Sequence, residues 1–275
     1  MEKSPPDIAK FKDLAKNFRK EILEIIHEAD SGHPGGSLSL VEILIGLYFY
    51  KINQKPQKPG WDKRDRVIIS KGHASPVVYV VLANRGYFPK DELMKFRKLG
   101  SYLQGHVVTD VPGVELSSGS LGQGLSFANG IAIGAKLRKD RFKTYCILGD
   151  GEIQEGSVWE AAMTAGFRKL DNICAILDNN GVQENGPIAE IKNTQPIAKK
   201  WRDFGWYVIE IDGHDFNEII DALDEFETVK DKPTFILANT VKGKGVSFME
   251  GNNKWHGKAP DNEQLKQALA EINEL

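Results

Sequence analysis

The chain has 275 residues, and 41% of them are hydrophobic, which is enough for one large α/β domain or two small ones. Its 36 basic and 38 acidic residues nearly balance and form no basic stripe or tail, so we expect no nucleic-acid partner. No apolar run reaches transmembrane length and the first ten residues are polar, so we expect neither a membrane span nor a signal peptide.

The first part of the chain is predicted to consist of helices joined by loops. Apolar residues at helical spacing predict an amphipathic helix over 8–29. The glycines and proline of 31–36 predict a loop that is not helical, after which Ser37 caps an apolar helix over 38–50. The segment 51–65 is rich in lysine and proline, which predicts a surface loop.

The next part begins with a short strand over 66–70 and a helix over 76–84. Pro89 takes the favoured first position of a helix predicted over 89–98. The segment 99–120 lacks periodicity, but its apolar content favours an ordered, functional loop. The segment 119–124 then opens a helix rich in small residues, which should pack closely against another helix.

The remaining elements alternate between strands and helices. Strands are predicted over 144–148, 173–177, 206–211 and 234–239, and helices over 156–170, 193–204, 216–228 and 261–273. The first two strands and the helix between them form a βαβ unit. We find no repeat and no linker, so residues 1–275 are predicted to form a single doubly wound α/β domain, with a mostly parallel sheet and helices on both faces.

Two cysteines, Cys146 and Cys174, indicate a reducing compartment, and we expect a cytoplasmic protein. Each lies in the middle of a predicted strand, which is typical of a buried small hydrophobic side chain. A disulfide between them would require the two strands to be neighbours.

Polar residues follow both strands of the βαβ unit. Gly149, Asp150 and Gly151 follow the first strand, and Asn180 follows the second. Ligands of open parallel sheets bind outside the carboxyl ends of the strands, so Asp150 and Asn180 should face one crevice. Their hard oxygens suit Mg²⁺ or Ca²⁺ better than zinc or copper. The glycines would let a phosphate approach the start of the following helix.

Two other interpretations of this motif are weaker. Gly149, Gly151 and Gly156 lack the G-x-G-x-x-G spacing of a dinucleotide site, and Asp150 would repel a pyrophosphate unless a cation lay between them. An isolated Gly-Asp-Gly is often an ordinary surface turn, an interpretation that Asn180 and its neighbour at the next strand end weaken.

Four of the six histidines lie in glycine-rich loops: His33, His73, His106 and His256. A single loop histidine is usually a surface residue. Four of them beside glycines favour a site in which histidines accept and donate protons. A zinc site is the weaker interpretation, because no pair has close ligand spacing.

Taken together, these motifs resemble transketolase. Gly-Asp-Gly, followed after the 27 residues 152–178 by Asn-Asn, is similar to the thiamin-diphosphate motif of that family. The resemblance covers about residues 10–260 and implies that Asp150, the Asn180 side chain and the Val182 carbonyl bind Mg²⁺ or Ca²⁺ beside thiamin diphosphate. The other matching segments are 31–35, 70–74, 119–124, 242–245 and 255–257.

The resemblance also implies roles for the loop residues. His73, Lys242 and His256 would lie near the diphosphate and the reacting carbon. His33 and His256 would contact the carbonyl and hydroxyls of the sugar, and His106 the terminal hydroxyl of the donor. The other residues implied to contact the cofactor or to link two active sites across a dimer contact are Gly119, Ser120, Leu121, Gly149, Gly151, Glu155 and Glu160.

Full transketolases also contain a pyrimidine-binding domain and a C-terminal domain, which we expect on a separate chain. The resemblance therefore implies the N-terminal subunit of a split transketolase of the pentose phosphate pathway. Such an enzyme transfers a two-carbon glycolaldehyde unit from a ketose phosphate to an aldose phosphate. We expect a homodimer within a heterotetramer, because the apolar helix over 156–168 has no polar face.

Two alternatives stay open. The chain could be a subunit of another thiamin-diphosphate transferase or synthase that acts on a different sugar or ketoacid. It could also be a non-catalytic module that binds thiamin diphosphate. The four loop histidines weigh against the module, because a pure binder has no need of proton relays.

Overall fold

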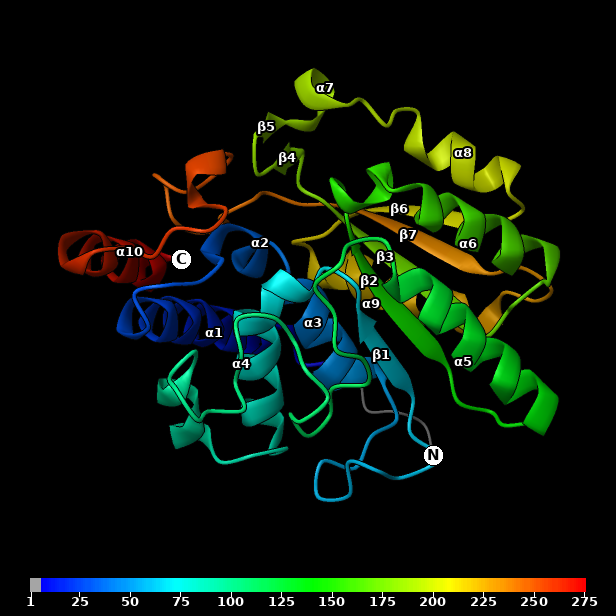
Figure 1. Ribbon diagram of the computed structural model, residues 1–275, viewed down its shortest axis with the longest axis horizontal. Coiled ribbons are helices and arrows are strands. Elements are labelled where there is room, and N and C mark those ends of the chain that lie inside the picture. The colour runs from blue at the N-terminus through cyan, green and yellow to red at the C-terminus, as the bar shows by residue number, and fades with distance from the viewer. Residues whose placement is uncertain (1–5) are drawn as a thin grey trace.

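The computed structural model describes residues 6–275 and is centred on a five-stranded sheet with the order β1-β2-β3-β7-β6 (Figure 1). All neighbouring strands run parallel, which confirms the predicted α/β fold. The strands are β1 (Arg66–Ile69), β2 (Thr144–Gly149), β3 (Ile173–Asn179), β6 (Tyr207–Asp212) and β7 (Thr234–Asn239).

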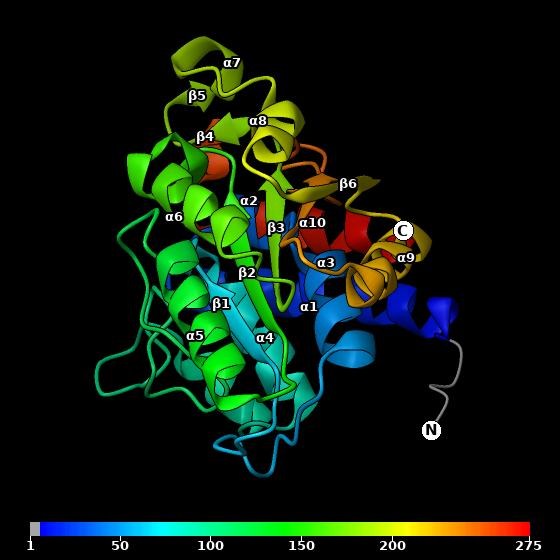
Figure 2. The ribbon, with the colours of Figure 1, turned by 90° about the vertical axis from the view of Figure 1, so that its right-hand side faces the viewer.

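Helices cover both faces of the sheet (Figures 1 and 2). Alternate strand residues point to opposite faces, so each strand contributes to two separate hydrophobic cores. One face packs against α1 (Ile8–Glu28), α3 (Val41–Ile45), α4 (Ser75–Arg85), α9 (Phe216–Thr228) and α10 (Asn262–Glu274). The other packs against α5 (Gly124–Arg138), α6 (Gly156–Phe167) and α8 (Ile197–Asp203).

The two cysteines lie on adjacent strands but on opposite faces of the sheet. Cys174 is in register with Tyr145, and Cys146 with Ala175. Cys174 belongs to the core beneath α1 and α9, whereas Cys146 belongs to the core beneath α5 and α6. Both are buried and free, so the disulfide considered from the sequence does not form.

The prediction of a non-helical loop over 31–36 was wrong at its end, because Pro34–Leu38 forms the short helix α2. Proline is tolerated in the first turn of a helix. A Cβ atom on Gly35 would lie 2.9 Å from the Trp255 carbonyl oxygen. Tertiary packing therefore requires glycine at a position where helix propensity alone disfavours it.

The single helix predicted over 38–50 was also wrong, because the chain forms α3 and then a π-helical turn, η1 (Gly46–Lys51). Ser37 lies within α2 and donates its hydroxyl to the His33 carbonyl, so it is not a cap. The helix predicted over 89–98 is a 3-10 turn, η3 (Lys90–Lys95).

The helix predicted over 193–204 begins only at α8. Pro196 precedes it, and residues before proline avoid the α conformation. No local pattern predicts the small elements between β3 and α8, namely β4 (Val182–Gln183), β5 (Gly186–Pro187) and α7 (Ile188–Ile191). The remaining short turns are η2 (Gly72–Ala74), η4 (Glu152–Gln154) and η5 (Asn253–Trp255).

Candidate active site

The carboxyl ends of β2 and β3 open into a cleft of about 240 Å³. Asp150 and Asn180 both line it, as their positions at two adjacent strand ends predict. The hairpin β4–β5, Gly36 of α2 and the segment around Lys242 close its other sides. The cleft also contains His73, Leu121, Gly149, Gly151, Glu155, Val182, Gln183 and His256.

Asp150 is a buried carboxylate that forms no ion pair with any residue of 6–275. Its two oxygens accept backbone hydrogen bonds from Gly151 at 2.8 Å and Gly181 at 2.5 Å. Burial, reinforced by the charge of Asp178, raises the pKa of the Asp150 carboxyl to about 6. At neutral pH the ionised form of Asp150 is buried at an energetic cost, and a bound cation would offset that cost.

The oxygens beside Asp150 form a set suited to a hard divalent cation. The Asn180 side-chain oxygen accepts a 3.2 Å bond from the Val182 amide, and the Val182 carbonyl accepts a 2.9 Å bond from Lys242 Nζ. One carboxylate, one amide oxygen and one carbonyl are ligands that Mg²⁺ and Ca²⁺ use. Within residues 6–275, no three His, Cys, Asp or Glu side chains are arranged to hold a metal ion, so the zinc alternative has no support.

A buried ion pair that the sequence did not predict lies beneath the cleft. Lys71 Nζ contacts Asp178 Oδ2 at 2.5 Å, and both side chains are almost completely buried. Ser39 and Thr240 also donate hydrogen bonds to Asp178. Burial opposes the charge of Asp178, but Lys71 and these two hydroxyls together outweigh burial and lower the pKa of its carboxyl. The available signal was a lysine and an aspartate at the ends of otherwise apolar strands.

Glu152 is a second buried carboxylate that the sequence analysis missed. It accepts backbone hydrogen bonds from Gly122 at 2.9 Å and Gly149 at 3.0 Å, and another from the Ser70 hydroxyl. Burial raises the pKa of its carboxyl. Glu152 thus ties the glycine-rich segment before α5 to the end of β2, and its position directly after Gly-Asp-Gly was the available signal.

The four loop histidines, which are far apart in the sequence, form one cluster. The His33 ring lies 5.3 Å from His73, 5.7 Å from His106 and 5.4 Å from His256, and the His73 and His256 rings are 5.2 Å apart. Burial lowers the pKa of His33 to about 4 and that of His256 to about 3, with nearby cations adding to the effect. Burial also lowers the pKa of His73 and His106, so the cluster is neutral at pH 7.

Lys242 links this cluster to the strand ends. Its Nζ atom lies 2.9 Å from His256 Nδ1 and 2.9 Å from the Val182 carbonyl oxygen. Burial and the charge of Lys71 lower the pKa of Lys242 to about 8.

His33 Nδ1 is buried without a hydrogen-bond partner among the described residues, so it can bond to a ligand.

Of the remaining predicted residues, some lie at the cleft or against the histidine cluster and others do not. Gly119 lies against His106, since a Cβ atom there would be 3.4 Å from the His106 ring. Ser120 is exposed and is not part of the cleft lining. Glu155 lines the cleft, whereas Glu160 is exposed on α6 and does not line it.

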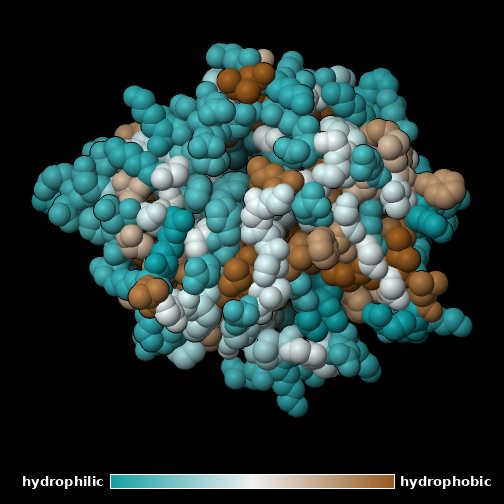
Figure 3. Space-filling view, in the orientation of Figure 1, coloured by the Kyte–Doolittle hydropathy of each residue, from teal (hydrophilic) through white to brown (hydrophobic). Residues whose placement is uncertain are grey.

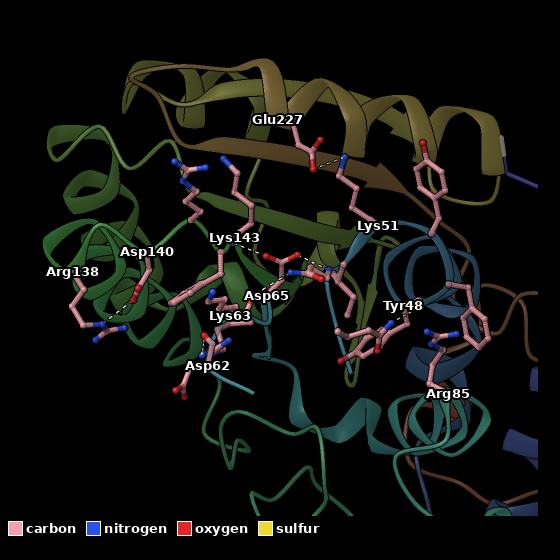
Figure 4. A pocket seen from close by; sticks show the side chains of 18 of the residues that line it. Tyr48, Lys51, Asp62, Lys63, Asp65, Arg85, Arg138, Asp140, Lys143 and Glu227 are labelled. Carbon is pink, nitrogen blue, oxygen red and sulfur yellow. Dashed lines mark hydrogen bonds and ion pairs between the residues drawn. The ribbon is translucent and has the colours of Figure 1, made fainter. Parts of the chain in front are cut away.

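A larger groove of about 1370 Å³ lies at the opposite, amino ends of β1 and β2 (Figure 4). Its charges pair with each other, as in Arg138–Asp140 at 2.8 Å and Lys51–Glu227 at 3.1 Å. It contains none of the predicted site residues. Convergence of buried carboxylates, histidines and lysines therefore identifies the smaller cleft as the candidate site, although it has less volume.

Comparison with known proteins agrees with this geometry. The chain is 41% identical to one subunit of the apulose-4-phosphate transketolase of Phocaeicola vulgatus, over 93% of this chain and 91% of that one. It is 43% identical to a 6-deoxy-6-sulfo-D-fructose transketolase subunit of Clostridium sp., over 94% of each chain. Human transketolase is 39% identical over 95% of this chain, which spans only 42% of the human protein.

The crystal structure of Campylobacter jejuni transketolase superposes with a TM-score of 0.93 at 35% identity, over 98% of this chain and 43% of that one. Among residues 6–275, no helix has both the length and the apolar character needed to cross a membrane. Residues 11–272 match the family described as "Transketolase, thiamine diphosphate binding domain". With this match and the cleft at the ends of β2 and β3, the chain belongs to the thiamin-diphosphate-binding domain family of the transketolases.

Proposed function

We propose that this chain is the N-terminal subunit of a split transketolase, with residues 1–275 forming only the diphosphate-binding domain. Assembled with a C-terminal subunit that binds the pyrimidine ring, it transfers a two-carbon unit from a ketose phosphate to an aldose phosphate. The observation that carries this proposal is the cleft lined by Asp150, Asn180, His73 and His256, with His33 and His106 clustered around the two lining histidines without lining the cleft themselves. The relatives from Phocaeicola vulgatus and Clostridium sp., which match over nearly their whole length, are also named as subunits.

In this proposal the residues at the strand ends hold the cofactor and its metal. The Asp150 carboxylate, the Asn180 side-chain oxygen and the Val182 carbonyl bind Mg²⁺, or Ca²⁺. The amide of Gly151, which donates to Asp150 Oδ1 in this structure, would donate to the diphosphate once the metal holds that carboxylate. Lys242 Nζ, which contacts the Val182 carbonyl in this structure, turns to the diphosphate instead. When bound, thiamin diphosphate supplies the electron sink for two-carbon transfer.

The histidines of this chain handle the sugar. A neutral imidazole carries one donor and one acceptor, so the cluster can hold hydroxyls and move protons without adding positive charge. His33 and His256 bind the carbonyl and hydroxyls of the donor, and His106 binds its terminal hydroxyl. His73 and His256 lie next to the diphosphate and the reacting carbon.

We also propose that the chain forms a homodimer within a heterotetramer, through α5 and α6. The exposed apolar side chains on these helices are Phe127, Leu137, Met163 and Phe167. They contribute to the hydrophobic surface over α5 and α6 in Figure 3. Glu155 directly precedes α6 and Glu160 lies on it, and we propose that they link two active sites across this contact. The assembly acts in the cytoplasm, in the pentose phosphate pathway.

One observation favours a second candidate function. Relatives that match this chain over nearly their own whole length are named for two different sugars, apulose 4-phosphate and 6-deoxy-6-sulfo-D-fructose. The second candidate is therefore a transketolase-type enzyme that uses a ketose donor of another kind. A panel of ketose donors offered to the assembled complex separates the two functions.

The proposal is tested by ketol transfer with three samples: this chain alone, this chain with its C-terminal partner, and the same complex carrying Asp150→Ala. We expect turnover only in the second sample, and only with thiamin diphosphate and Mg²⁺. Strong turnover by the chain alone would contradict the split enzyme. Turnover by the Asp150→Ala complex equal to that of the unmodified complex would contradict the proposed site.

A further inference from the structure

A buried ion pair and a partly buried histidine beside it lie outside the cleft and are not used by the proposed chemistry. Arg19 on α1 contacts Glu42 on α3 at 2.7 Å, and His214, in the turn before α9, contacts Glu42 Oε2 at 3.0 Å. Arg19 and Glu42 are only 3% and 6% exposed. A buried ion pair often adds no more stability than apolar residues of the same size, so its presence calls for another explanation.

Two of these side chains, His214 and Arg19, form hydrogen bonds with the backbone on either side of Lys242. The Val241 amide donates to His214 Nε2 at 2.9 Å, and Arg19 Nε donates to the Lys244 carbonyl at 2.9 Å. These two backbone groups stand on either side of Lys242 in the sequence. The segment is therefore held at two points by side chains that converge on Glu42.

The hydrogen bonds also determine the state of the His214 ring. Because the Val241 amide donates to Nε2, that nitrogen carries no proton, and Nδ1 holds the proton that is donated to Glu42. Burial opposes the charge on Glu42, but Arg19 and His214 outweigh burial and lower the pKa of its carboxyl. The ionised Glu42 thus orients His214, as second-layer carboxylates orient metal-bound histidines.

We propose that Glu42, Arg19 and His214 position Lys242 in the cofactor cleft, an inference that rests on the proposed function. The Lys242 ammonium lies 2.9 Å from the Val182 carbonyl and 2.9 Å from His256 Nδ1, the place from which it turns to the diphosphate in the proposed function. A shift of its backbone would move it away from that place. None of the three residues lines the cleft. They are positioning residues, and their effect reaches the cofactor only through the segment 241–244.

The test compares His214→Ala, His214→Gln and the control His27→Ala. His27 is also a partly buried histidine bonded to a backbone group, the Pro260 carbonyl, but it lies away from the cleft. Hydrogen exchange of residues 240–251 is measured on the chain itself. Affinity for thiamin diphosphate with Mg²⁺ is measured on the complex with the C-terminal partner, and the melting temperature of every variant is recorded.

We expect His214→Ala to speed exchange in residues 240–251 and to weaken thiamin diphosphate binding about tenfold, as loss of one buried hydrogen bond predicts. His214→Gln keeps a donor and an acceptor and should restore most of both properties. His27→Ala should leave both unchanged, even if its melting temperature falls as far.

Unchanged exchange and affinity in His214→Ala would overturn the proposal, and so would an equal loss of affinity in His27→Ala at equal melting temperature. Failure of the unmodified complex to bind thiamin diphosphate would instead refute the proposed function. In that case the exchange comparison would still test whether His214 holds the segment 241–244.

Discussion

Individual side chains in and around the cleft have pKa values that differ from those of the same residues in water. Asp150 is buried beside a second carboxylate, and four histidines crowd together and stay neutral. Both arrangements cost folding free energy in the absence of ligands. The free energy of unfolding should therefore respond to single substitutions and to pH in directions that these side chains determine.

Replacing Asp150 by Asn should have opposite effects on stability and on cofactor binding. The pKa of Asp150 is raised to about 6, so at pH 7 its charge destabilises the folded protein by about 3 kcal/mol. The amide removes this charge but cannot accept both backbone hydrogen bonds, which offsets about 1–2 kcal/mol of the gain. The melting temperature of the ligand-free chain should rise, while affinity for thiamin diphosphate with Mg²⁺ should fall about 100-fold. Calorimetry measures both, and a parallel loss of both would contradict this account.

The histidine cluster predicts a loss of stability on acidification. The folded pKa values of His33 and His256 are about 4 and about 3, below the unfolded value near 6.5. From pH 6.5 down to about 4 the unfolded chain binds more protons, so stability falls by about 1–2 kcal/mol per histidine by pH 5. The raised pKa of Asp150 acts in the opposite direction over part of this range.

This pH dependence is isolated by comparing variants. Urea unfolding of the ligand-free chain is measured at pH 7 and pH 5. We expect the loss of unfolding free energy to be smaller in His33→Asn/His256→Asn than in the unmodified chain. His27→Gln, outside the cluster, should behave like the unmodified chain, and an equal loss in all three would show that the cluster is not responsible.

The sequence predicted the two strand ends and the four histidines, because Gly-Asp-Gly, Asn-Asn and glycine-flanked histidines are local patterns. It did not predict the Lys71–Asp178 pair, whose members are 107 residues apart. Buried charged residues pair with residues that are close in the folded structure, and a local sequence pattern does not reveal such partners. Only the arrangement of β1 beside β2 and of β2 beside β3 brings them together.

Among the elements, those with strong periodicity or a continuous apolar run were predicted closely. The predicted range 234–239 equals β7, and the predicted helix over 156–170 differs from α6 by three residues at its end. The elements that were wrong, α2, η1 and η3, are short. For α2, a contact with a distant segment decides the form. At Gly35 that contact is the Trp255 carbonyl, which no local rule reveals.

The packing of α6 against the loop before β6 gives a test at this scale. A Cβ atom on Gly166 would lie 1.9 Å from the Phe204 carbonyl oxygen, so Gly166→Ala must displace backbone and should cost about 2 kcal/mol of unfolding free energy. Gly130→Ala on α5 meets no atom within 4 Å and should stabilise by about 0.5–1 kcal/mol. Urea unfolding distinguishes them, and equal effects would contradict this packing.

At the scale of the whole molecule, the two faces of the sheet are covered differently. The face beneath α1, α3, α4, α9 and α10 carries the larger core. The other face is covered by α5, α6 and α8, and Leu137 and Phe167 on its outer side are 80% and 83% exposed. An apolar surface of this kind marks an interaction site.

We expect Leu137→Glu/Phe167→Glu to convert a dimer of this chain to a monomer, because two charges on each copy would be desolvated in the contact. Sedimentation velocity at several concentrations measures the change. Leu99→Glu is the control, since Leu99 is equally apolar and fully exposed but lies in a distant loop. A double variant that still sediments as a dimer would place the contact elsewhere.

The charges around the cleft bear on the order in which its ligands arrive. The lining includes two lysines, Lys71 and Lys242, and Lys71 is already neutralised by Asp178. The lining carboxylates are Asp150, Glu152, Glu155 and Glu184. A diphosphate that approaches without a metal ion is repelled by the net negative charge of the lining. A divalent cation is attracted to the same charge, and once bound it makes the electrostatic potential in the cleft positive. Uptake of the organic cofactor should thus be gated by the supply of free magnesium.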